Sequence, residues 1–158
     1  MATPDFVLAL REKIGTAPLW LSGVTAVVVR DHDVLLVRRA DTGAWTPVTG
    51  IIDPGEEPAV AAVREVEEEA AVQARAARLV WVHVTDAVVY ENGDRSQYLD
   101  LVFRLDWLGG EPAPADGENT EAAWFSLDAL PPLSHDMRSR IQAAVDNRPE
   151  ARFEPSGA

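Results

Sequence analysis

The sequence predicts an α+β protein in which helices cover a mixed sheet. Several runs are rich in β-branched and aromatic residues, and segments rich in proline and glycine separate them, which indicates strands joined by turns and loops. Three other segments have the apolar spacing or the composition of helices, so strands outnumber helices along the chain. With 158 residues, of which 47% are hydrophobic, we expect one domain, residues 1–158, with a buried core.

Each expected element has a local reason. Apolar side chains recur at helical spacing in the first helix, a proline begins the second, and Ser134 can cap the last. The expected helices are residues 4–14, 58 to about 71, and 134–147. Runs of β-branched residues and the turn sequence ENGD predict hairpins. The expected strands are the two arms of 23–40, joined at 31–33, and residues 79–90, 96–107 and 121–127.

Two long segments are expected to be loops. Residues 41–57 contain three glycines and two prolines, and residues 109–120 are also rich in both. The core is expected at about residues 22–147, with a frayed tail from Arg148.

Composition excludes several classes of protein. The formal net charge is −12, and a surface this acidic opposes the phosphates of a nucleic-acid polymer. A small anionic ligand remains compatible with it where metal ions and a few arginines reverse the local field. The chain has no cysteine, which excludes disulfides and thiolate metal sites and fits the cytoplasm. It also lacks a signal-peptide pattern and an apolar run long enough to span a membrane, so we expect neither secretion nor a membrane partner.

Residues 64–70, REVEEEA, concentrate negative charge on one short helix. At helical spacing Glu65, Glu68 and Glu69 share a face, Arg64 lies beside Glu68, and Glu67 points elsewhere into solvent. Another stripe is apolar and is expected to be buried; it holds Ala59, Val63, Val66 and Ala70. The acidic face has two interpretations: a solvated helix surface, or a site for a hard cation such as Mg²⁺, which prefers carboxylate oxygens.

The residues before this stretch favour the cation site. From Gly50 the chain reads GIIDPGEEPAVAAVREVEEEAAV, which resembles the Nudix box, G-x5-E-x7-R-E-U-x-E-E-x-G-U, where U is apolar. The defined positions match except that Ala71 replaces the last glycine, and a chance match has a probability of roughly one in 10⁵. Val48-Thr49 also stand where many members have Pro-Gly before the box glycine. The resemblance implies a Nudix-like α/β/α sandwich with a mixed sheet between helices.

The resemblance also implies an activity and roles for the box residues. Nudix enzymes are metal-dependent hydrolases that cleave the pyrophosphate linkage of a nucleoside diphosphate derivative or a nucleoside triphosphate, by attack of water on phosphorus. Mg²⁺ is the expected cofactor, and Mn²⁺ is expected to substitute for it. By motif position, Glu65 and Glu69 are the principal metal ligands and Glu68 is a third ligand or the base. Arg64 would orient a glutamate, Glu56 would support the site, and the Gly50 carbonyl is a further candidate ligand.

Candidates outside the box are less well determined. Arg38 and Arg39 end a strand before the loop, Arg104 lies on a strand face that lines the cleft or faces water, and two glutamates lie in a late loop. The candidate substrate-binding residues are Arg38, Arg39, Arg104, Glu118 and Glu121. On an otherwise apolar strand, His83 is expected to be structural. The leaving group is not assigned, since Val88 stands where many ADP-ribose hydrolases have a proline.

Three other readings stay open. The first is a Nudix-fold nucleotide-binding or regulatory module without turnover, the second a metal-dependent isomerase on the same fold, and the third an acidic interaction protein. A homodimer is also compatible with the sequence. At Ala71 we expect ordinary helical or extended dihedral angles, because a residue other than glycine is disfavoured in the left-handed region.

Overall fold

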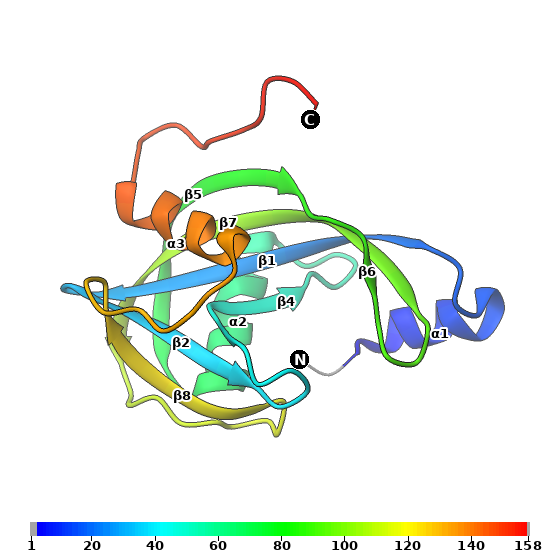
Figure 1. Cartoon of the computed structure of the whole chain (residues 1–158), viewed down its shortest axis with the longest axis horizontal. Helices are drawn as coiled ribbons and strands as arrows, with labels where there is room; N and C mark the ends of the chain where they lie inside the picture. Colours follow the sequence, from blue (N-terminus) through cyan, green and yellow to red (C-terminus); the bar gives the residue numbers. More distant parts are fainter. Residues whose placement is uncertain (1–2, 158) are drawn as a thin grey trace.

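Residues 3–157, which the computed structural model describes, form a mixed sheet of eight strands with three helices (Figure 1). The helices are α1 (Asp5–Ile14), α2 (Pro58–Ala70) and α3 (His135–Asp146). The strands are β1 (Leu19–Arg30), β2 (Asp33–Arg39), β3 (Trp45–Thr46), β4 (Val48–Ile51), β5 (Gln73–Val84), β6 (Val88–Val89), β7 (Arg95–Gly109) and β8 (Asn119–Ser126). The fold class is the α+β class that the sequence predicts. Within residues 3–157 no helix combines the length and apolar content that crossing a membrane requires.

β1 is the central strand and is paired along both edges. On one side it runs parallel to β7, and β7 continues the sheet antiparallel to β5. The other edge of β1 is shared, because residues 23–26 pair with β4 and residues 29–30 pair with β2. β2 in turn pairs with β8 (Figure 1). This divergence sets β4 beside β1 and in contact with α2, whose second half carries the acidic stretch.

Each face of the sheet carries its own apolar core. Successive side chains of a strand point to opposite faces, so alternate residues of β1 and β2 enter different cores. The core under α2 includes Val24, Val28, Leu35, Val66 and Leu105. The core under α3 includes Val27, Leu36, Val102, Ile141 and Ala144. The two helices therefore lie on opposite faces of the sheet, which gives three layers.

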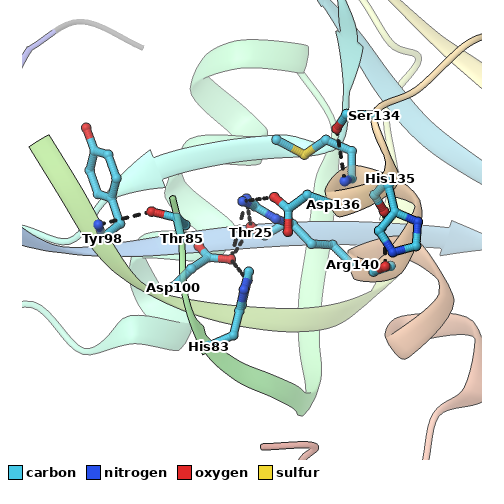
Figure 2. A network of polar contacts seen from close by, with 11 residues as sticks. Thr25, His83, Thr85, Tyr98, Asp100, Ser134, His135, Asp136 and Arg140 are labelled. Atoms are coloured by element: carbon cyan, nitrogen blue, oxygen red, sulfur yellow. Dashed lines mark hydrogen bonds and ion pairs between the residues drawn. The ribbon is translucent and has the colours of Figure 1, made fainter. Parts of the chain in front are cut away.

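A buried polar network fixes α3 on the sheet (Figure 2). Asp100 of β7 is its centre: the Oδ2 atom accepts a hydrogen bond from Thr25 Oγ1 at 2.8 Å and lies 2.9 Å from His83 Nε2. Arg140 of α3 donates to Thr25 Oγ1 at 2.9 Å, and its Nη1 atom is 3.5 Å from Asp100 Oδ2. All four side chains are buried, so their charges are compensated inside the protein. His83 is the structural histidine that the sequence predicts.

The polar face of β7 is covered by α3 and does not line a substrate cleft along the helix. Val102 on this face packs in the core with Ile141 and Ala144. The Arg104 Nη1 atom donates to the carbonyl oxygen of Ala144 at 3.1 Å, near the end of α3. Arg104 thus satisfies a helix carbonyl on the face opposite to α2, away from the carboxylates of the acidic helix.

Two segments expected to be irregular take part in the sheet. The loop of residues 41–57 contains β3 and β4, whose short pairings the sequence pattern does not reveal. Beyond Arg148, the Arg152 N–H donates to Val80 O at 2.8 Å, and the Arg152 carbonyl accepts from Val82 N–H at 3.0 Å. The Arg152 guanidinium also lies 4.2 Å from the ring centroid of Trp81. The tail therefore does not fray from Arg148 but pairs with the edge of β5 around Trp81.

Ala71 has left-handed dihedral angles, so the expectation of ordinary ones is wrong. At φ 56° and ψ 26° it caps the C-terminus of α2, and its N–H donates to Glu67 O at 3.1 Å. The chain must leave the helix here to begin β5 at Gln73, and a left-handed residue provides the sharp change of direction. Alanine accepts a conformation that costs it about 1 kcal/mol or more.

Ala71→Gly is therefore expected to stabilise the protein by about 1 kcal/mol, because glycine adopts these angles without strain. We expect kcat to stay nearly unchanged, because the backbone path does not change. Chemical unfolding measures the difference. Ala9→Gly, in the exposed middle of α1, is the matched control and should destabilise by about 1 kcal/mol. A destabilised Ala71→Gly protein would show that the left-handed cap is not strained.

Candidate active site

Gly50 of β4 and Glu65 of α2 lie in close contact. A Cβ atom on Gly50 would lie 2.3 Å from both Cγ and Cδ of Glu65, which is closer than such atoms approach. Only glycine lets the glutamate side chain lie flat against the strand. Two defined positions of the box that lie far apart in sequence, Gly50 and Glu65, are therefore in direct contact.

Two of the box carboxylates are buried. Glu65 is 4% exposed and Glu69 is 3% exposed, one turn apart on α2. Burial, and then the nearby charge of Glu69, raises the pKa of Glu65 from its ordinary value of 4.5 to about 7. Burial also raises the pKa of Glu69. The buried side of α2 thus includes two acids. Of the apolar stripe expected to be buried, Val66 and Ala70 are buried and Ala59 and Val63 are half-buried.

Arg64 joins three carboxylates at the mouth of the site. Its Nε and Nη2 atoms donate to the two oxygens of Glu56 at 2.9 and 2.8 Å, a bidentate pair. Its Nη1 atom donates to Glu65 Oε1 at 2.9 Å and to Glu68 Oε2 at 3.2 Å. The hydrogen bonds to Glu56 raise the pKa of Arg64 above its ordinary value. The structure therefore places Glu56 in the loop as the partner of Arg64 and leaves Glu68 the most exposed of these carboxylates.

Asn119 is a site residue that the sequence did not reveal. It is buried at the start of β8, and its Nδ2 atom donates to Glu69 Oε2 at 3.3 Å. The nearby charge of Asp116 also raises the pKa of Glu69. The expectation of a further acid in the late loop points to Glu118 and Glu121, and an amide between them gives no comparable signal in the sequence. Of those two, Glu118 is half-buried, and Glu121 accepts from Arg38 at 2.9 Å.

The two arginines at the end of β2 have different surroundings. Arg38 binds Glu121 and the Gly43 carbonyl, both at exposed positions. Arg39 pairs across the sheet with Asn119, and the charge of Glu69 contributes to its raised pKa after the larger effect of Asp41. Arg39 is thus the arginine of the pair that lies near the acidic helix.

A pocket of about 710 Å³ opens beside these carboxylates. Arg64, Glu65 and Glu68 of α2 line it, together with residues 51, 53 and 54 and residues 115–116. The rest of its lining comes from residues 3–6, just before and within the first turn of α1. This volume lies within the range of pockets that hold a small organic ligand. Trp45 is not among its residues and packs instead edge-to-face on Phe125 in the core under α3.

The donor chemistry of the site fits a hard divalent cation. Glu65 and Glu69 are buried oxygen donors whose ionised forms are disfavoured where they lie, and a cation would relieve that cost. In the described part of the chain, no three acidic or histidine side chains converge closely enough to form a ready set of metal ligands. Arg64 already occupies oxygens of Glu65 and Glu68. The residues fit such an ion in type and charge.

Gly50→Ala is expected to lower kcat/KM by at least about 100-fold, because the added methyl group displaces Glu65 from β4 and misplacement by an ångström is enough for such a loss. Steady-state kinetics measure it, with circular dichroism to confirm the fold. Gly109→Ala is the matched control, since the nearest atom to a Cβ there is 3.5 Å away. Normal turnover in Gly50→Ala would mean that the position of Glu65 is not critical.

Together, the fold and the site define an α+β protein with an acidic helix at a pocket of nucleotide size. The family model of the NUDIX domain matches residues 20–144, and the chain belongs to the Nudix family. This match contains the box and all of the sheet except the first residue of β1. It leaves α1 and the C-terminal tail outside.

Relatives of known name agree with this family. The chain is 36% identical over 109 residues to the NAD-capped RNA hydrolase NudC of Pseudomonas aeruginosa, covering 68% of this chain and 36% of that protein. It is 29% identical over 122 residues to the ADP-ribose pyrophosphatase of Methanocaldococcus jannaschii, covering 75% and 69%. The chain thus spans only about a third of the NudC proteins.

A solved structure agrees as well. The crystal structure of an ADP-ribose pyrophosphatase from Streptococcus suis superimposes with a TM-score of 0.66 at 25% identity, covering 85% of this chain and 98% of that one.

Proposed function

We propose that the protein is a metal-dependent hydrolase that cleaves the pyrophosphate linkage of a small nucleotide by attack of water on phosphorus. The observation that carries the proposal is the pair of buried carboxylates, Glu65 and Glu69, held one turn apart on a rigid helix. Glu65 is pressed against Gly50 and opens onto a pocket of about 710 Å³. Membership of the Nudix family supports the same reaction class.

Glu65 and Glu69 would hold Mg²⁺ or Mn²⁺, with Glu68 and the carbonyl of Gly50 as further ligands. When bound, such an ion polarises phosphate oxygens and neutralises the charge that develops during phosphoryl transfer. A helix suits this task because its side chains keep their spacing without loop motion.

The other polar residues position these carboxylates. Arg64 holds Glu65 and is itself held by both oxygens of Glu56, so the Glu56–Arg64 pair fixes the side of the site toward the loop. Asn119 fixes one oxygen of Glu69 from β8. Glu68 is more exposed and is our candidate for the group that accepts a proton from the attacking water.

We propose a small nucleotide as substrate rather than the end of a polymer. The net charge of −12 opposes long phosphate backbones. By their names, the NudC relatives act on NAD-capped RNA and the other relatives on ADP-ribose, so both substrates belong in the test.

The decisive experiment is hydrolysis of a panel of nucleoside diphosphate derivatives, nucleoside triphosphates and NAD-capped RNA in isotopically labelled water with Mg²⁺. We expect a small nucleotide to be cleaved, with labelled oxygen in one phosphate product. Label in a non-phosphate product would contradict attack on phosphorus. Cleavage of capped RNA alone would contradict the proposed substrate class. Nucleotide binding without any product would favour the binding or regulatory module instead.

A further inference from the structure

We propose that Asp5, on the N-terminal wall of the pocket, selects against substrates that carry more negative charge than a diphosphate linkage. The wall consists of residues 3–6, which line the same pocket as Glu65 and Glu68 of α2. These residues precede the segment that the Nudix family model matches, which begins at residue 20. The inference rests on the proposed function and names a substrate class for the same site.

The wall is held in place by α1. Val7 is buried with Leu21 and Ile51, and Phe6 packs against the same cluster. Farther along the helix, Arg11 donates to the carbonyl of Arg95 at 2.7 Å and to Ser96 Oγ at 3.1 Å, both on β7. α1 is therefore fixed to the sheet through β7, and its first turn contributes to the lining of the pocket. Figure 1 shows α1 at the end of the sheet.

The charges around the pocket are strongly unbalanced. Its described lining includes five acids, contributed by the wall, the loop before α2, α2 itself and the late loop: Asp5, Asp53, Glu65, Glu68 and Asp116. Arg64 is the one cation among these described lining residues, and its hydrogen bonds already go to Glu56, Glu65 and Glu68. Metal ions bound at α2 would neutralise the acids on that side of the pocket. Asp5 lines the pocket from α1 and is not one of the proposed metal ligands, so these ions would not neutralise its charge.

With this arrangement of charges, we expect the pocket to discriminate between substrates by their negative charge. A diphosphate that joins two sugar groups carries a charge of about −2, whereas a nucleoside triphosphate carries up to about −4 at neutral pH. A phosphate chain that starts at the carboxylates of α2 and extends across the pocket approaches Asp5. The repulsion rises with each added charge, so the longer phosphate chain loses more binding.

The test compares kcat/KM for a nucleoside diphosphate sugar and the matching nucleoside triphosphate at saturating Mg²⁺. Asp5→Asn should shift the ratio toward the triphosphate by about fivefold, and Asp5→Lys should shift it further. Glu12→Gln, which removes an exposed charge from the same helix, is the matched control and should leave the ratio unchanged. High salt should reduce the shift. If Asp5 only stabilises the first turn of α1, its substitution would change the stability of the protein and leave the ratio of kcat/KM values unchanged. An unchanged ratio in both Asp5 variants overturns the inference.

The failure of the proposed function gives a different result. In that case wild-type protein would hydrolyse neither nucleotide. Calorimetric titration with methylene-bridged analogues of both substrates then reads the affinity ratio without turnover. We expect the affinity ratio of Asp5→Asn to shift toward the triphosphate analogue relative to that of Glu12→Gln. Equal affinity ratios in the two variants would show that Asp5 does not select between the substrates.

Discussion

Glu69→Gln is expected to keep the fold and lose about 10³-fold in kcat. The substitution removes one negative charge from the proposed metal site with almost no change of shape, and the lost interaction is worth about 4 kcal/mol in the transition state. The amide oxygen of glutamine can still accept the hydrogen bond that Asn119 now donates to the glutamate. Stability should be equal or higher, because the buried charge is gone.

Glu67→Gln is the matched control for this variant. Glu67 lies on the same helix, two residues away, but is exposed to solvent. Its rate should be within about twofold of wild type, since a surface charge contributes little. A wild-type rate for Glu69→Gln, with a normal thermal midpoint, would exclude Glu69 from the site.

Exhaustive chelation of divalent metal is expected to lower turnover by at least about 10³-fold. Without a cation, the phosphate charge would meet the acids of α2 unneutralised, and water would lose its activation. Adding Mg²⁺ or Mn²⁺ in excess of the chelator should restore the rate. Residual activity that is the same with and without chelator would contradict a metal-dependent reaction.

The same chelated protein should become less stable as the pH rises from about 5 to 8. Between the ordinary pKa of 4.5 and the raised value of about 7, the folded protein holds a proton on Glu65 that the unfolded chain has released. Protons bound in excess by the native state favour folding, and this contribution is lost as the pH rises through 7. The difference in unfolding free energy between wild type and Glu65→Gln should change by about 2 kcal/mol over this pH range. A flat difference would mean that Glu65 titrates normally.

Local rules predict the parts of the site that lie within one element. Helical spacing brings Arg64 beside Glu68, which the structure shows, and sets Glu65 and Glu69 one turn apart on one face, where both are buried; Glu68 is exposed. The hairpin turns, the N-cap of Ser134, which accepts from Met137 N–H at 3.2 Å, and the extent of α2 to within a residue follow from the same kind of rule. Each depends on residues within a few positions of one another.

The errors concern properties that distant residues decide. The sequence leaves the strand face of Arg104 either lining the cleft or facing water, because Arg140, which covers Asp100 on this strand, is 40 residues away from Asp100 in sequence. Asn119 gains its role only when β8 pairs with β2 and meets Glu69. Ala71 has left-handed dihedral angles because the chain must turn into β5, although alanine itself disfavours that conformation.

The pairing of Arg152 with β5 bears on how copies of the protein can associate. β5 is the last strand on its side of the sheet, and an uncovered edge strand is a template for pairing with another chain. Residue 152 takes up the hydrogen-bonding groups of Val80 and Val82 that a neighbouring copy would need. A homodimer with a sheet continuous through the middle of β5 therefore requires the tail to leave first. A chain that ends before residue 152 would offer that edge to solvent, and its oligomeric state is expected to differ from that of the 158-residue chain.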